Sequence, residues 1–173
     1  MKYRRLRLFL IGSLLAITFL SSQERNFHVN QTGRYSMLVE SNSSKSTRNI
    51  DNGTVEYFVI NDEDGLFRYY YSVTSIELDK YLDVNDNDYI QSFQSECGCK
   101  VNSVAESRFN NFSGVEILFS SEKDGNTLQG KTISHCTKRG QLLSISFLTR
   151  EGDFSKYETR FEMLLDSFVI NAD

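Results

Sequence analysis

Three cysteines and two histidines are the residues of this sequence whose types could support metal or redox chemistry. Cys97 and Cys99 flank a glycine at the end of an expected helix, and Cys136 follows His135 on an expected strand. Redox dithiols and zinc sites commonly use a C-x-x-C spacing, which is absent here. A helix C-terminus also has the wrong polarity to stabilise a thiolate. His135 and Cys136 point to opposite faces of a strand, which disfavours a shared metal.

The acidic stretch 83–88 is the other local pattern with ligand chemistry. An EF-hand loop needs glycine at its sixth position and glutamate at its twelfth, where this chain has Asp88 and Gln94. The sequence contains no G-x-S-x-G, no H-E-x-x-H and no phosphate-binding glycine loop. We therefore expect no catalytic residues, no cofactor and no metal site.

The first 22 residues have the pattern of an export signal. A basic start is followed by an apolar run over residues 8–20, which is within the range of a signal-peptide core and short for a membrane-spanning helix. Ser21 and Ser22 then precede charged residues. We expect cleavage after Ser22 and export to the periplasm or the medium, with an uncleaved membrane anchor over residues 1–22 as the alternative.

The charge of the chain changes once this leader is set aside. The leader holds 4 basic residues and no acidic ones, which leaves 15 basic against 23 acidic residues and a net charge of −8. Such a surface repels nucleic acid and anionic membranes. Nucleic acid is therefore excluded as the expected partner.

Export also bears on the cysteines, because exported chains meet oxidising conditions. A disulfide between Cys136 and either Cys97 or Cys99 would close a loop of roughly 40 residues and stabilise the domain by about 3–4 kcal/mol. We expect such a bond, with three reduced thiols as the alternative, since a domain of this size holds a core without cross-links.

Hydrophobic patterns divide residues 23–173 into the elements of one domain. Apolar alternation predicts short strands at 27–29 and 35–39 and a β-hairpin formed by 55–60 and 66–76. A helix ending at Gly98 follows, then strands at 101–109, 115–120, 128–137 and 143–147, with a tight turn at Asp124-Gly125. The last helix places apolar side chains on one face at Phe154, Tyr157, Phe161, Leu164 and Phe168.

Two further segments are interpreted by composition. Residues 41–54 are rich in serine and asparagine with a single apolar residue, which predicts a long surface loop. Tyr57, Tyr69, Tyr70 and Tyr71 concentrate aromatic surface on the first hairpin. Exposed tyrosines are good interface anchors, so we consider Tyr69, Tyr70 and Tyr71 as an interface, with Tyr70 on the face opposite the other two. Packing of these rings against a helix is the alternative, and it is the commoner fate of such side chains.

The predicted order is an α+β domain, with an antiparallel sheet of hairpin plus meander and helices packed on it. It resembles the PsbP-like superfamily over most of residues 27–171. The resemblance rests on four stretches, which are GRYSM at 33–37, YYYSV at 69–73, GVE at 114–116 and DSFVI at 166–170. The opening strand of that family usually ends near a proline, which this chain lacks. The family shares no catalytic residues, so the resemblance implies a binding or assembly role.

These observations predict a non-catalytic exported module that binds a protein partner in the cell envelope. The alternative is a periplasmic protein that binds a small molecule or a metal in a cleft beside residues 41–54.

Overall fold

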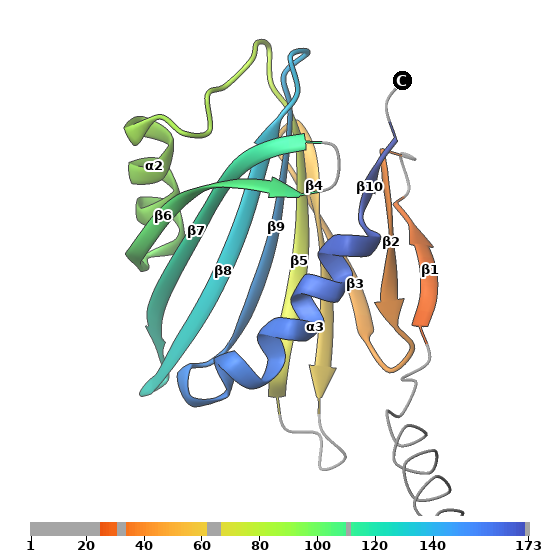
Figure 1. Cartoon of the computed structure of the whole chain (residues 1–173), viewed down its shortest axis with the longest axis vertical. Coiled ribbons are helices and arrows are strands. Elements are labelled where there is room, and N and C mark those ends of the chain that lie inside the picture. The colour runs from red at the N-terminus through yellow and green to blue at the C-terminus, as the bar shows by residue number, and fades with distance from the viewer. Residues whose placement is uncertain (1–24, 31–33, 62–66, 110–111, 172–173) are drawn as a thin grey trace, which may run out of the picture.

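The chain folds around two antiparallel sheets in a computed structural model that describes residues 25–30, 34–61, 67–109 and 112–171 (Figure 1). The large sheet has seven strands in the order β3-β4-β5-β9-β8-β7-β6, and the small sheet has three in the order β1-β2-β10. The expected leader at residues 1–22 lies outside the described residues. Within the described residues, no helix has the length and apolar character needed to cross a bilayer. The α+β class predicted from the sequence is confirmed.

The strands of the large sheet are, in chain order, β3 (Ser44–Ile50), β4 (Gly53–Asn61), β5 (Phe67–Glu77), β6 (Lys100–Phe109), β7 (Phe112–Lys123), β8 (Asn126–Cys136) and β9 (Gln141–Arg150). The small sheet consists of β1 (Arg25–Val29), β2 (Tyr35–Glu40) and β10 (Val169–Ile170). The helices are α2 (Asn87–Cys97), the 3-10 turn η1 (Glu151–Asp153) and α3 (Phe154–Ser167).

The predicted hairpin and meander are both present. β4 pairs with β5, and β6 to β9 pair in sequence. β9 then pairs with β5, which joins the two units into one sheet. Asp124 and Gly125 form the turn between β7 and β8 with positive φ angles of 51° and 75°, as a two-residue hairpin turn requires.

The loop predicted at residues 41–54 is wrong, because most of this segment is the edge strand β3 and the start of β4. β3 pairs with β4 from Ser44 opposite Val59 to Ile50 opposite Gly53. All its residues but Ile50 are exposed. Strand pairing uses backbone groups, so an edge strand without a buried face carries no apolar alternation for the sequence to reveal.

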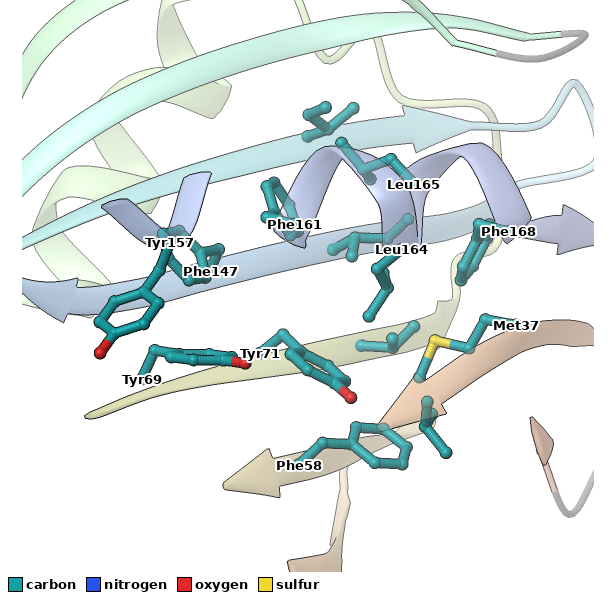
Figure 2. Packing of buried hydrophobic residues seen from close by; sticks show 14 of the residues in the cluster. Met37, Phe58, Tyr69, Tyr71, Phe147, Tyr157, Phe161, Leu164, Leu165 and Phe168 are labelled. Carbon is teal, nitrogen blue, oxygen red and sulfur yellow. The ribbon is translucent and has the colours of Figure 1, made fainter. Parts of the chain in front are cut away.

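The main core lies between the large sheet, the small sheet and α3. Every apolar residue predicted for the inner face of the last helix is buried. The Phe161 ring stacks on Phe147 of β9, with centroids 5.4 Å apart. Figure 2 shows Met37 of the small sheet near Phe58, Tyr71 and the end of α3, so this core joins both sheets. α3 begins directly after Asp153.

Buried carboxylates also tie the small sheet to the rest of the fold. Glu56 of β4 meets His28 of β1 at 3.1 Å and Lys45 of β3 at 2.6 Å, and the Tyr35 hydroxyl donates to it. Burial alone raises the pKa of Glu56, but the hydrogen bonds from Lys45, Tyr35 and His28 outweigh burial and lower it. On β2, the buried Glu40 accepts a hydrogen bond of 2.6 Å from the Tyr69 hydroxyl.

The helix α2 is capped at both ends, and its predicted end at Gly98 is confirmed. The Asp86 side chain accepts from the backbone N–H of Asp88 at its start, and Gly98 ends it in the left-handed conformation.

The expected disulfide from Cys136 is wrong, because Cys97 is joined to Cys99 and Cys136 is a buried free thiol. Cys99 lies only two residues beyond Cys97, across the sharp turn at Gly98.

Candidate binding groove on the α2 face

The large sheet presents opposite faces to α3 and α2, and the α2 face carries a group of six hydroxyl side chains. They form two adjacent cross-strand rows on β5, β9 and β8. The cross-strand register places these residues opposite one another, so the side chains of each row share one face. We call this group the hydroxyl field, and it consists of Ser72, Ser146 and Thr132 in one row and Thr74, Ser144 and Ser134 in the next.

The rows on either side of the hydroxyl field are apolar. Ile76, Leu142 and Cys136 form the row on one side. Tyr70 and Leu148 belong to the row on the other. The polar group is therefore confined to the middle of the face.

A hollow with a volume of about 720 Å³ separates α2 from this floor. None of the residues of α2 is buried, and its apolar side chains Ile90 and Phe93 are only half-buried. Thr74, Thr132, Ser144 and Ser146 of the hydroxyl field line this space. Beside this space α2 contacts the sheet, where the Phe93 ring meets Phe119 of β7 edge-on with centroids 5.4 Å apart. We call the space the α2 hollow.

Hydroxyl groups in the floor are linked to one another and to α2. Thr132 bonds Ser146 at 2.8 Å, and Ser134 bonds Ser144 at 2.8 Å. The Tyr89 hydroxyl of α2 donates to Ser134 at 2.7 Å. Burial raises the pKa of Tyr89, so this phenol stays neutral and keeps its proton. The floor is therefore an uncharged hydrogen-bonding surface.

The walls of the α2 hollow add aromatic and charged groups. Tyr57 of β4 and Phe93 of α2 line it on opposite sides of the sheet floor. Arg48 comes from the edge strand β3, while Asp88 and Glu96 come from α2. Of the described residues that line the hollow, none is a histidine or a lysine, which leaves acids and phenols as its only proton-transfer groups.

A second, apolar hollow of about 560 Å³ lies farther along the same face, near the hairpin that joins β7 and β8. Its apolar lining comes from Val59, Phe67, Tyr70, Leu128 and Leu148, and we call it the apolar hollow. The Tyr70 ring also meets the ring of Tyr57 edge-on, with centroids 6.3 Å apart. Because Tyr57 lines the α2 hollow, this aromatic pair marks the boundary between the two hollows.

The structure separates the tyrosines that the sequence groups together. Tyr69 and Tyr71 are 2% and 3% exposed in the core beneath α3, so the expectation that they form an interface is corrected. Strand alternation turns Tyr70 to the opposite face, where it is half-buried in the lining of the apolar hollow. Burial, followed by Tyr57, raises the pKa of Tyr70.

Sequence reasoning missed the hydroxyl field. Its residues are serines and threonines placed at every second position of β5, β8 and β9, a pattern that also fits an ordinary solvated strand face. The signal was their coincidence on three strands, which becomes visible only once the cross-strand register is known.

Of the cysteines, Cys97 lies at the rim of the α2 hollow and Cys136 beneath the helix. Among the described residues there is no cluster of three His, Cys, Asp or Glu side chains arranged to hold a metal ion.

Comparison with solved structures identifies the fold as PsbP/Mog1-like, which confirms the resemblance stated from the sequence. Cyanobacterial PsbP (CyanoP) from Synechocystis superposes with a TM-score of 0.58 and 12% identity, over 88% of this chain and 96% of that one. The Ran-binding protein Mog1p from Saccharomyces cerevisiae gives a TM-score of 0.53 and 12% identity, over 86% and 96%.

A protein from Bacteroides thetaiotaomicron is similar as well, with a TM-score of 0.57 and 11% identity. The match covers 87% of this chain but only 50% of that longer protein. No family model and no curated protein matches the sequence. At these identities the likeness shows the fold alone, and the function has to be argued from the chain's own surfaces.

Proposed function

We propose that this chain is an exported, non-catalytic module that binds a protein partner of the cell envelope through the apolar hollow. The observation that carries the proposal is a solvent-open concavity lined by Tyr70, Phe67, Leu128 and Leu148 in an otherwise acidic protein. Exposed apolar concavities with an aromatic anchor are typical of protein interfaces.

The residues that line the α2 hollow favour binding over catalysis. A nucleophile needs a base within hydrogen-bond reach and an orienting third group. In the described part of the α2 hollow, the hydroxyls are bonded to other hydroxyls, as in the Thr132–Ser146 and Ser134–Ser144 pairs. The similar fold of Mog1p belongs to a protein described as Ran-binding, which adds support for a binding role by analogy only.

The cell envelope is proposed as the location because of the leader pattern. The basic start, the apolar run at 8–20 and the serines at 21–22 together favour export. An acidic domain with a net charge of −8 disfavours nucleic-acid partners in any compartment.

The partner can be captured by photo-crosslinking of the full chain in its native cells. A photoreactive phenylalanine replaces Leu128 inside the apolar hollow, and the matched control replaces Val104, which is exposed on the far edge strand β6. We expect one abundant crosslinked protein from position 128 that is absent from position 104. The crosslink should weaken in the variant Tyr70→Ala. Identical crosslinks from both positions, or none at 128, would refute the assignment of this surface.

A small-molecule ligand is the second candidate function, and a specific observation favours it. The α2 hollow is enclosed by a helix on one side and an uncharged polar floor on the other, and its volume of about 720 Å³ lies within the usual range for ligand sites.

A further inference from the structure

We propose that the α2 hollow is a binding site for a neutral polyhydroxylated ligand, a saccharide, and that the hydroxyl field forms its floor. The proposal goes beyond the protein-binding role, because it concerns a different hollow and different residues. Its basis is the juxtaposition of an uncharged hydroxyl floor, aromatic walls and charged rim groups in one concavity.

The hydroxyl field has spare hydrogen-bonding capacity directed at the hollow. A hydroxyl donates one hydrogen bond and accepts up to two, so the Thr132–Ser146 pair leaves one O–H and several lone pairs for other partners. In the Ser134–Ser144 pair the Tyr89 hydroxyl lies 2.7 Å and 3.4 Å from the two oxygens, and the pair still keeps lone pairs as acceptors. Ser144 and Ser146 are each one member of such a pair, and both are half-buried and line the hollow. Thr74 lies in the same row as Ser144 and also lines it. A ligand that offers both donors and acceptors matches this surface.

The absence of charge in the floor selects against ionic ligands. A charged group placed on the floor itself loses solvation without gaining an ionic partner there, because the charged residues Arg48, Asp88 and Glu96 lie in the walls of the hollow. Tyr89 stays neutral beside Ser134, since burial raises the pKa of its phenol. The hydroxyl groups of a saccharide are neutral, and each both donates and accepts.

The walls fit the remaining surfaces of a sugar ring. Tyr57 and Phe93 offer aromatic rings to the C–H face of a pyranose, while Arg48 and Glu96 on the rim offer paired donors and acceptors to its outer hydroxyls.

Helix α2 packs on the sheet through Tyr89, Ile90 and Phe93 and also covers one side of the hollow. Each described side chain of α2 retains solvent exposure, although Ile90 and Phe93 form an apolar stripe typical of a packed helix. Tyr89 reaches across to Ser134 with its hydroxyl and fixes the helix at one end of the hydroxyl field. A ring bound in the hollow beside Phe93 would bury more of this stripe.

The test uses the protein purified from its native cells and three neutral disaccharides, maltose, lactose and N,N′-diacetylchitobiose. Binding is measured by titration calorimetry and by the amide chemical shifts of Thr74, Ser144 and Ser146. Tetraethylene glycol serves as the control probe, because it offers ether oxygens but no neighbouring hydroxyls. We expect at least one disaccharide to bind and to shift these amides, and the glycol to leave them unmoved.

Variants then assign the binding to the hydroxyl field. Thr74→Val combined with Ser144→Ala removes two floor hydroxyls at nearly constant volume and should weaken binding by about tenfold or more. The matched control is Thr47→Val on the exposed edge strand β3, which should bind as the unaltered protein does. The proposal is overturned if no disaccharide binds, if the glycol binds equally well, or if the double variant retains full affinity. Occupation of the hollow by a peptide of the crosslinked partner would overturn it too.

Neither the calorimetric signal nor the amide chemical shifts depend on the apolar hollow. Tyr70→Ala should weaken the protein crosslink and leave the amide shifts at Ser144 in place. Loss of both activities in that variant would indicate one shared site and would contradict the separation of the two hollows.

Discussion

The two faces of the seven-stranded sheet are built from the same strands but differ in chemistry. The face toward α3 is sealed by aromatic and aliphatic side chains, and its buried carboxylates, such as Glu56, are paired. The face toward α2 carries hydroxyls in its middle, two hollows and a helix without a buried residue. The difference indicates that the α3 face supplies most of the stability, while the α2 face is free to serve binding.

The largest expected effect concerns the aromatic rings that α3 and α2 direct at the sheet. Phe161→Ala removes a ring that is 1% exposed and stacked on Phe147, and we expect it to cost about 3–5 kcal/mol of unfolding free energy. Phe93→Ala removes a half-buried ring and should cost about 1–2 kcal/mol. Urea denaturation followed by circular dichroism measures both. Equal losses of unfolding free energy in the two variants would contradict the inference that the α3 face supplies most of the stability.

A smaller loss is expected from the buried carboxylate at the junction of the two sheets. Glu56→Gln keeps the shape but removes the charge that Lys45, His28 and Tyr35 contact, and should cost about 1–3 kcal/mol. Glu77→Gln, at an exposed ion pair with Arg34, is the control and should cost about 0.5 kcal/mol or less. A neutral result for Glu56→Gln in the same denaturation assay would mean that the cluster does not stabilise the fold.

The same carboxylate predicts how stability depends on pH. Burial alone raises the pKa of Glu56, but hydrogen bonds from Lys45, Tyr35 and His28 outweigh it, so the pKa in the folded state is lowered. Below the ordinary glutamate pKa of about 4.3, Glu56 becomes protonated in the unfolded chain but stays ionised in the folded chain. The contribution of Glu56 is therefore present above that pH and is lost as the pH falls toward the folded-state pKa. Urea midpoints of the unaltered protein and Glu56→Gln should converge on acidification, and a constant gap would contradict the sign.

A comparable or smaller effect is expected from the cross-link at the end of α2. Cys97 and Cys99 are two residues apart in sequence, so their disulfide closes a very small loop. In the chain-entropy description its loss lowers the unfolding free energy by about 1–2 kcal/mol. Hydrogen exchange in the Cys97→Ser, Cys99→Ser double variant should accelerate in α2 and stay unchanged in α3. Acceleration in both helices would show that α2 is coupled to the core.

Strong periodicity made the α3 face predictable from sequence, whereas the α2 face was harder to derive. Phe154, Tyr157 and Phe161 repeat at helical spacing. The alternation on β5 separated Tyr70 from Tyr69 and Tyr71 but did not decide which side is buried. The edge strand β3 could not be recognised in the sequence because it pairs through backbone hydrogen bonds and has no apolar alternation. Disulfide pairing also escaped prediction, because it depends on proximity in space and no sequence pattern encodes it.

The candidate site was partly predictable. Alternation placed Tyr70 on the face opposite its neighbours, and the structure puts it beside both hollows. The hydroxyl field required the register of β5 against β9 and of β9 against β8, which arises from long-range pairing. Serine and threonine are common on solvated strands, so no local signal distinguished this group.

The smallest expected effect is that of Thr74→Val, which is compared with Val73→Thr on the other face of the same strand. Val73 and Thr74 are neighbours on β5, with Val73 in the α3 core and Thr74 in the hydroxyl field. Val73→Thr buries a hydroxyl in an apolar cluster and should cost about 1–3 kcal/mol. Thr74→Val removes a half-buried hydroxyl that borders an open hollow, and should change the unfolding free energy by about 0.5 kcal/mol or less. If Thr74→Val costs as much as Val73→Thr, the hydroxyl field is a structural network and stability alone accounts for its residues. A near-zero cost, paired with weaker disaccharide binding, would leave ligand recognition as the reason for hydroxyls at these positions.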